Sequence, residues 1–256
     1  MPKQLICIAG NFHKACAIQT AKKAIKILEK KKIPFVVDSG FLKIRNAMPL
    51  NKINADFFLV FGGDGTMLHV VRELKRQKPV LGVNCGNRGH LMQVQPEQIE
   101  AAIEKILRGK FSIEKRARLN VIVDGKSAPS PLNEIIVTPK KSFTLFDYSL
   151  SVGQRVLSGC ADAVAIVTPN GSTAFALAAS GKKIEIKKKV FEILPVHAFS
   201  GIKKPLVVSD KTKILIEPLG KKVGCEAIID GQRRLTIKKE VVVQKGRESA
   251  LFVKLR

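Results

Sequence analysis

The sequence predicts two domains, an α/β domain with a mostly parallel sheet over residues 1–110 and a β-rich domain over residues 111–256. Strand and helix patterns alternate through the first hundred residues, which is typical of a parallel sheet covered by helices. From about Phe111 the chain changes to short β-prone segments separated by Gly, Pro, Asn or Asp. This change of composition sets the expected boundary, and 256 residues suffice for two modest cores.

The first half is expected to form a Rossmann-like sheet. Apolar residues recur at steps of three and four over residues 18–28, which predicts an amphipathic helix that closes near Lys32. Residues 57–61 form a continuous apolar run that ends at Gly62, as expected for a strand buried on both faces. The other expected elements are strands at 5–9, 35–37 and 80–83, a helix that begins at Thr66, and a helix over 99–107.

The second half is expected to be β-sandwich-like. One helical stretch from Ser172 to about Ser180 interrupts its strands, and the tail at 251–255 is expected to pair back onto an earlier element. The expected strands cover residues 120–123, 134–137, 163–167, 206–208, 213–216 and 240–244.

A formal net charge of +24 is the strongest compositional signal, and it favours a partner rich in phosphate. Nucleic acid is the first such partner to consider. However, the lysines are spread along the whole chain, and aromatic residues make up only 5%, with no Trp and one Tyr to stack on bases. We therefore favour a generally lysine-coated surface and expect no nucleic-acid partner.

The sequence carries no signal for a membrane or for export. It has no apolar run of about eighteen residues, and its N-terminus lacks the three regions of a signal peptide. Its 5 cysteines are odd in number and scattered without a C-x-x-C pair, which fits neither a disulfide framework nor a zinc site. We expect reduced thiols in a cytoplasmic protein that has no membrane partner.

A glycine-rich turn, G-G-D-G-T at residues 62–66, separates the buried strand from the next helix. Ligands of open α/β sheets bind at such junctions, where unpaired N–H groups of the helix can meet an anion. Glycine lets phosphate oxygens approach the main chain closely. The carboxylate of Asp64 is then suited to accept a proton from an attacking hydroxyl, or to hold a divalent cation. The alternative is a tight turn with Asp64 as helix N-cap. The P-loop motif is absent from the sequence.

A second turn, T-P-N-G-S-T-A at residues 168–174, follows the expected strand at 163–167. Ser172 or Thr173 can cap a helix of small residues there, and small side chains leave space for a flat group against the backbone. An ordinary capped helix is the alternative.

Three further polar segments are weak signals when each is taken alone. Asn133 and Glu134 enter an apolar strand, so they are either exposed at its mouth or poised to bind a ligand. Asp162 is expected at the opposite end of the strand that precedes Thr168. Residues 228–232, which include Asp230, are typical of a hairpin turn.

In this order, the five segments resemble the NAD kinase family. That family carries a strand-GGDG-helix element, an Asn-Glu or Asn-Asp pair, an Asp followed by T-P-x-G-S-T-A, and a late D-G-Q-like turn; the matching segments span residues 57–232. The GGDG element is shared with diacylglycerol and sphingosine kinases and with phosphofructokinases, whereas T-P-x-G-S-T-A is far more specific. A lipid kinase is the closest enzymatic alternative.

The resemblance implies a phosphotransferase that moves the terminal phosphate of ATP to the 2'-hydroxyl of the adenosine ribose of NAD, with Asp64 as proton acceptor. It implies that Asp162 meets the nicotinamide riboside end and that Gln232 closes the site. The residues implied to bind the two nucleotides are Gly62, Gly63, Gly65, His69, Asn133, Glu134, Asp162, Asn170, Thr173, Ala174, Phe175, Ala178 and Gln232. A divalent cation, Mg²⁺, would accompany ATP. Polyphosphate is the donor in some members, and a homodimer or homotetramer is expected.

The sequence also departs from the family pattern. Phe175 stands where a Tyr is common, so stacking survives while a contact through the phenolic hydroxyl is lost. The other departures are Cys160 in place of a basic residue, Ala163 in place of Gly, His90 in place of Phe, and residues 182–184 in place of G-P-I. These departures leave the preference for NAD or NADH open, and also the choice of ATP or polyphosphate as donor.

Overall fold

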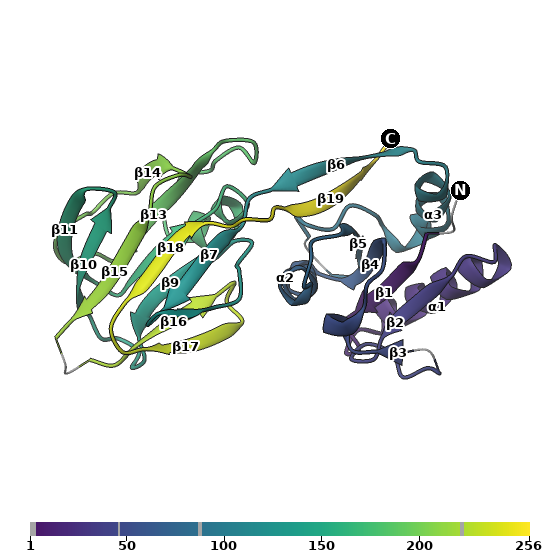
Figure 1. Ribbon diagram of the computed structural model, residues 1–256, viewed down its shortest axis with the longest axis horizontal. Coiled ribbons are helices and arrows are strands. Elements are labelled where there is room, and N and C mark those ends of the chain that lie inside the picture. The colour runs from purple at the N-terminus through teal and green to yellow at the C-terminus, as the bar shows by residue number, and fades with distance from the viewer. Residues whose placement is uncertain (1–3, 46, 87–88, 221–222) are drawn as a thin grey trace. The chain divides into compact units, whose positions relative to one another are not determined.

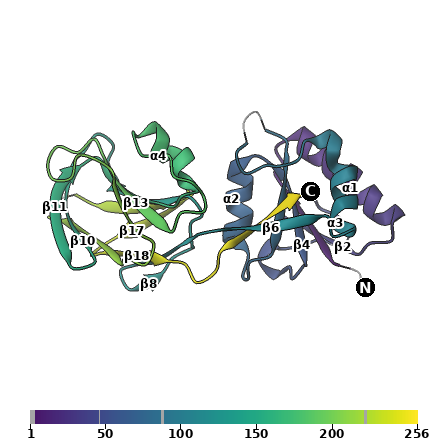
Figure 2. The ribbon, with the colours of Figure 1, turned by 90° about the horizontal axis from the view of Figure 1, so that it is seen from above.

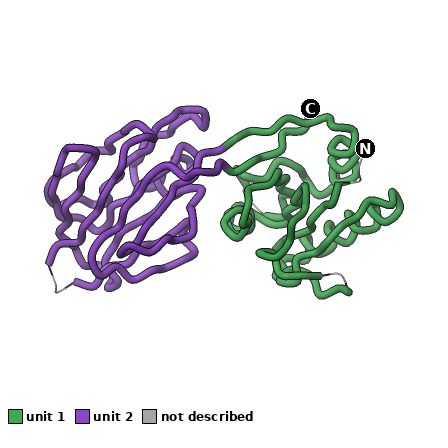
Figure 3. Tube along the Cα trace, in the orientation of Figure 1, with its two compact units in different colours: residues 1–115, 250–256 green, residues 116–249 purple. Residues whose placement is uncertain are grey.

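The computed structural model describes residues 4–45, 47–86, 89–220 and 223–256, and the chain divides into two compact units (Figure 3). Unit 1 runs to residue 115 and includes residues 250–256, and unit 2 comprises residues 116–249. The change of composition in the sequence had predicted a boundary at residue 110 instead. The difference arises because strand β6 (Phe111–Arg116) pairs within the sheet of unit 1, next to strand β19 (Ala250–Leu255) from the tail.

Within the described residues, unit 1 holds one seven-stranded sheet, in the order β3-β2-β1-β4-β5-β19-β6 (Figure 1). The strand pairs from β3 through β19 are parallel, as expected from the alternating pattern. The remaining elements of this unit are β1 (Ile6–Gly10), α1 (Ala15–Lys30), β2 (Phe35–Asp38), β3 (Ala47–Met48), η1 (Leu50–Lys52), β4 (Phe57–Gly62), α2 (Asp64–Glu73), β5 (Pro79–Asn84), η2 (Pro96–Gln98) and α3 (Ile99–Leu107).

Helices α1 and α3 cover one face of this sheet, and α2 lies on the other (Figure 2). Helix α1 buries a stripe of small and apolar residues between Ala17 and Leu28, and Ile103 of α3 joins the same core. Side chains of β4 alternate between the faces, so Phe61 enters that core while the equally buried Phe58 belongs to the other face. The continuous apolar run of β4 is thus buried on both sides, as predicted.

The strand order reverses between β1 and β4, which are paired in parallel at the centre of the sheet. Strand β1 leads through α1 to β2 on one side, and β4 leads through α2 to β5 on the other. The loops that follow Gly10 and Gly62 therefore leave the same sheet edge in opposite directions. Ligands of open α/β sheets bind at such a switch point.

Two six-stranded antiparallel sheets make up unit 2 as far as it is described, in the orders β11-β10-β15-β18-β7-β8 and β14-β13-β12-β9-β16-β17. The elements of this unit are β7 (Leu119–Val123), β8 (Lys126–Ser127), β9 (Glu134–Pro139), β10 (Phe146–Val152), β11 (Arg155–Ala161), β12 (Ala163–Val167), η3 (Gly171–Thr173), α4 (Phe175–Ala178), β13 (Val190–Val196), β14 (Leu206–Ser209), β15 (Ile214–Leu219), β16 (Cys225–Ile229), β17 (Arg233–Ile237) and β18 (Val241–Lys245).

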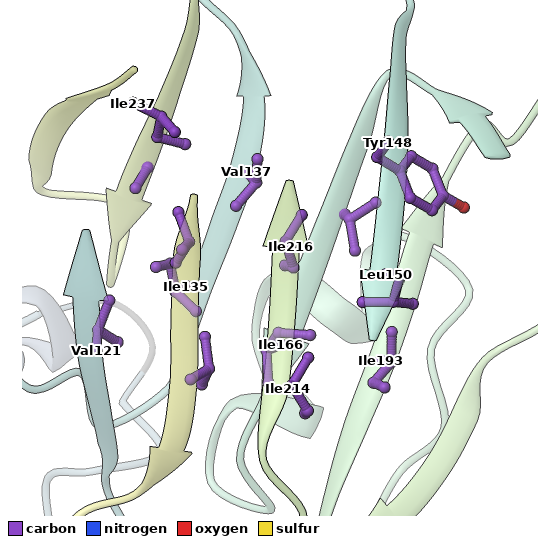
Figure 4. Close-up of a cluster of buried hydrophobic side chains, with 14 of the residues drawn as sticks. Val121, Ile135, Val137, Tyr148, Leu150, Ile166, Ile193, Ile214, Ile216 and Ile237 are labelled. Carbon is purple, nitrogen blue, oxygen red and sulfur yellow. The ribbon is translucent and has the colours of Figure 1, made fainter. Parts of the chain in front are cut away.

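The two sheets of unit 2 share one hydrophobic core (Figure 4). Val121 and Ile216 enter it from one sheet, and Ile135 and Ile166 enter it from the other. Side chains from two facing sheets that interdigitate in this way define a sandwich. The predicted fold class, a parallel α/β domain followed by a β-sandwich-like domain, is confirmed.

The expected helix at 172–180 is wrong in extent. Only the 3₁₀ turn η3 and the four-residue α4 form there, because Ala174 between them has φ −105° and ψ −127°, and Ser180 ends the segment with φ 64°. Helix α2 begins two positions before the expected Thr66. Among the described residues, no helix is both long and apolar enough to cross a membrane.

Candidate active site

Asp64 is the first residue of α2 and not its N-cap, which is Gly63. Its carboxylate instead accepts two backbone hydrogen bonds from a loop that follows β5. The N–H of His90 donates to Oδ2 at 2.9 Å, and the N–H of Leu91 donates to Oδ1 at 3.0 Å. The side chain of Asp64 nevertheless remains 33% exposed. The carboxylate is therefore held in one orientation and is still accessible.

The glycines around Asp64 leave bare main chain at the carboxyl ends of β4 and β5. A Cβ on Gly62 would lie 2.4 Å from Thr66 Oγ1, so a larger residue would displace the first turn of α2. A Cβ on Gly86 would lie 3.5 Å from the Cα of Gly63, which shows how closely the two loops approach. The Cys85 N–H donates to the Gly62 carbonyl at 2.7 Å and joins them. Gly63 and Gly86 therefore carry no side chain that would keep an anion away from their main chain.

Lys14 brings a cation to this bare main chain. Its Nζ lies 3.2 Å from the Cβ position of Gly86 and 3.8 Å from that of Gly63. Across the described residues, no carboxylate lies within ion-pair distance of its ammonium. Lys14 was not among the site residues predicted from the sequence. The available signal was a lysine at the N-cap of α1, where the helix dipole disfavours a positive charge.

His69 is an exposed residue of α2, slightly more than one helical turn after Asp64. Its Nδ1 is 3.5 Å from Arg72 Nη2, on the same helix.

In unit 2, the antiparallel pairing of β9 and β12 places Glu134 opposite Val167. Asn133, just before β9, therefore lies beside Thr168, just after β12. The Thr168 N–H donates to the Asn133 carbonyl at 2.8 Å, and Thr168 Oγ1 donates to the Leu132 carbonyl at 2.6 Å. The turn at residues 168–171 and the Asn-Glu pair are thus one locally tied unit.

Side-chain amides continue this connection. Asn170 Nδ2 donates to Asn133 Oδ1 at 2.5 Å, and Arg116 Nη1 donates to Asn170 Oδ1 at 2.7 Å. All three side chains are more than nine-tenths buried. Arg116 was not among the predicted site residues, because its partners lie more than 50 positions away in sequence.

Glu134 is a buried acid with an unusual environment. Burial, and secondarily the charge of Asp230, raise its pKa from an ordinary 4.5 to about 8. Its Oε2 is buried without a hydrogen-bond partner among the described residues. Burial of Glu134 therefore favours its protonated, neutral form.

The remaining predicted residues of unit 2 are more exposed. Asp162 lies at the opposite end of β12 from Thr168, as expected, and its Oδ2 is 2.8 Å from His197 Nδ1. This strand length keeps Asp162 out of the hydrogen-bonded group around Asn133. Residues Ala174, Phe175 and Ala178 are exposed on and beside α4, and Gln232 is exposed in the hairpin after Asp230, while Thr173 Oγ1 donates to the Asn170 carbonyl at 3.4 Å.

Residues Lys182, Lys183 and Ile184 stand where the family has G-P-I, and hydrogen bonds hold the loop they form at both ends. The Lys182 N–H donates to Glu192 Oε1 at 2.6 Å, and the Ile184 N–H donates to Ser172 Oγ at 3.0 Å. The two lysines themselves face solvent. This loop keeps a defined geometry in spite of its changed sequence.

Both halves of the chain match family models, the ATP-NAD kinase N-terminal domain over residues 6–111 and the ATP-NAD kinase C-terminal domain over residues 132–255. The chain belongs to the ATP-NAD kinase family. It is 34% identical to the NAD kinase of Methanothermobacter thermautotrophicus over 98% of this chain and 91% of that protein. Members of the ATP-NAD kinase family are phosphotransferases, so the lipid-kinase alternative is set aside.

Two solved structures share the fold of this ATP-NAD kinase family member. An NAD kinase from Archaeoglobus fulgidus in complex with ATP aligns with a TM-score of 0.82 at 25% identity, over 98% of this chain and 94% of that chain. Yeast NADH kinase complexed with NADH aligns with a TM-score of 0.89 at 21% identity, over 100% of this chain and 84% of that chain. The latter likeness concerns the fold alone.

Proposed function

We propose that the chain transfers the terminal phosphate of ATP to the 2'-hydroxyl of the adenosine ribose of NAD, with Asp64 as the proton acceptor. Family membership supports the overall reaction. The observation that carries the role of Asp64 is its carboxylate, which two backbone N–H groups orient while a third of the side chain stays open.

In this mechanism the 2'-oxygen attacks the γ-phosphorus while its proton passes to the Asp64 carboxylate. The bond from the γ-phosphorus to the bridging oxygen breaks, and ADP leaves with that electron pair. Each carboxylate oxygen accepts one backbone N–H from the loop after β5 and keeps lone pairs for the proton. Such a general base contributes about 10² to 10⁴-fold to rate. Positioning and charge neutralisation supply the rest.

The ammonium of Lys14 beside Gly63 is assigned to the phosphates of the donor. The family resemblance assigns Gly62, Gly63 and Gly65 to the same phosphates and places His69 near them. The described residues include no group of three or more His, Cys, Asp or Glu side chains that could hold a metal ion. The divalent cation, Mg²⁺, is assigned to the substrate, entering on the triphosphate of ATP. Bound there, it would neutralise charge that develops on the phosphate oxygens.

The dinucleotide is assigned to unit 2. The buried and hydrogen-bonded group supports this role for Asn133, Glu134 and Asn170. Phe175 is 39% exposed, which supports stacking of its ring on the dinucleotide. The family resemblance alone supports the assignment of Asp162, Thr173, Ala174, Ala178 and Gln232, as well as a homodimer or homotetramer. Five free thiols support a reducing compartment such as the cytoplasm.

The test is an assay with ATP, Mg²⁺ and NAD, in which NADP is detected with an NADP-specific dehydrogenase. Replacing ATP by polyphosphate in the same assay identifies the donor. Asp64→Asn should retain the fold and NAD binding while turnover falls by about 10²-fold or more. Asp56→Asn is the matched control, because Asp56 Oδ2 also accepts a backbone N–H in unit 1, from Leu5 at 2.9 Å. An Asp64→Asn rate equal to that of the control would remove the assigned role.

A further inference from the structure

The buried row of Arg116, Asn170 and Asn133 has a fixed polarity. A guanidinium has only N–H donors, so the atom of Asn170 that faces Arg116 must be the acceptor Oδ1. The Nδ2 of Asn170 then faces Asn133, and Asn133 must offer its own Oδ1 in return. The charge at one end of the row thus decides the orientation of both amides.

The other polar groups of Asn133 are already engaged. Its backbone N–H donates to Asp230 Oδ1 at 2.8 Å, and its carbonyl accepts the Thr168 N–H. What remains is the side-chain Nδ2, for which the described residues provide no partner. Asn133 keeps 7% of its surface exposed, and its Nδ2 is not among the fully buried unpaired atoms. A donor that is largely buried but still reaches solvent is available to an acceptor atom of a ligand.

We propose that Arg116 is a positioning residue, which orients Asn170 and Asn133 so that Asn133 presents an N–H donor to an acceptor atom of NAD. The proposal rests on the proposed function. Without the guanidinium, both amides can rotate together, and their mutual hydrogen bond survives with its polarity reversed. In that state Asn133 presents an oxygen, which repels the same acceptor.

The experiment compares single variants by steady-state kinetics and by calorimetric titration of NAD without ATP. Arg116→Met removes the donor and keeps much of the side-chain volume. If half the molecules then adopt the reversed polarity, the KM and the Kd for NAD rise at least about twofold, with the KM for ATP unchanged. Arg116→Lys keeps a positively charged hydrogen-bond donor, so its KM and Kd for NAD should stay closer to the wild-type values. Asn170→Asp offers only acceptors, which forces Asn133 to reverse, and should raise the KM for NAD about tenfold or more.

Arg118→Met is the matched control. Arg118 is equally buried in the same unit, but its Nη2 donates to the backbone carbonyl of Ser130 at 2.7 Å. Its replacement should lower the unfolding temperature without changing the Kd for NAD. An equal rise in Kd for Arg116→Met and Arg118→Met would overturn the proposal, and so would an Arg116→Lys variant as impaired as Arg116→Met. A wild-type protein that binds no NAD would instead overturn the proposed function.

Discussion

The carboxylate of Asp230 accepts the backbone N–H of Asn133 at 2.8 Å, although 97 positions separate the two residues in sequence. Its other oxygen accepts the N–H of Leu132 at 3.1 Å. Asp230 can do so because it sits in the turn between β16 and β17 with φ 47°, and β16 pairs with β9. The hairpin motif and the Asn-Glu motif are therefore parts of one structure, in which the turn holds the start of β9.

Asp230→Ala should lower both stability and affinity for NAD. Loss of the hydrogen bonds to a charged group should cost on the order of 2 kcal/mol of unfolding free energy, and a loosened Asn133 should raise the KM for NAD. Asp124→Ala is the matched control, because Asp124 also has a positive φ, of 49°, and accepts backbone N–H groups, from Lys238 to Glu240. Urea unfolding should show a similar loss of unfolding free energy for both variants. A rise in the KM for NAD in the control as well would show that Asp230 acts only through stability.

Glu134 should make stability depend on pH. Its pKa is raised to about 8 in the folded chain, so between about pH 4.5 and 8 the folded state holds a proton that the unfolded state has released. The unfolding free energy should therefore fall as pH rises through this window, by on the order of a few kcal/mol.

Glu134→Gln keeps a neutral side chain of the same shape and should remove that decline. Urea unfolding at pH 5, 7 and 9 gives the free energy of unfolding of the wild type and of the variant. Taking the difference between the two at each pH cancels the titration of the groups that they share. The largest gain of the variant over the wild type is expected at pH 9. A difference that stays constant with pH would show that Glu134 is already ionised in the folded state.

The fold could be predicted to the extent that its signals are local. The run at residues 57–61 and the three-four periodicity of α1 specify a buried strand and an amphipathic helix without reference to the rest of the chain. Strands β3, β6, β8, β10, β11, β13, β16 and β17 were not predicted. Strand β11 illustrates the reason, because it is an edge strand with a Gly and with Val156 exposed, so its side chains do not alternate cleanly.

The candidate site divides in the same way. Asp64 could be proposed from the sequence because the glycines on both sides of it mark a turn, and five residues are enough to show the chemistry of that turn. Arg116 and Lys14 could not, because each acquires its meaning from atoms that the fold brings near, such as Asn170 Oδ1 and the Cβ position of Gly86. The spacing of residues in sequence carries no record of such contacts.

Lys14→Gln should weaken the binding of ATP, the phosphate donor, and leave the binding of NAD, the acceptor, unchanged. The ammonium lies beside bare main chain with no described carboxylate to neutralise it, so its loss should raise the KM for ATP about tenfold, the size of one charged hydrogen bond. The KM for NAD should be unchanged. Lys14→Arg should retain most of the affinity, and Lys22→Gln, on an exposed position of the same helix, is the control. Equal KM values for ATP in the Lys14→Gln and Lys22→Gln variants would exclude Lys14 from the phosphate site.

Gly171→Ala should damage both the fold of unit 2 and the affinity for NAD. A Cβ at this position would lie 2.4 Å from the Asn133 carbonyl oxygen and 2.7 Å from its carbon, and backbone atoms cannot move aside as a flexible side chain can. The expected loss of unfolding free energy is about 1–3 kcal/mol, the range for overpacked sites. Because the strain falls on Asn133, the KM for NAD should rise in parallel. Gly224→Ala is the control, since the nearest atom to its Cβ is Lys140 Cδ at 3.8 Å and the change should be close to neutral. Urea unfolding and NAD titration of both variants would measure these effects, and a Gly171→Ala protein as stable as Gly224→Ala would mean that the turn does not press against Asn133 in solution.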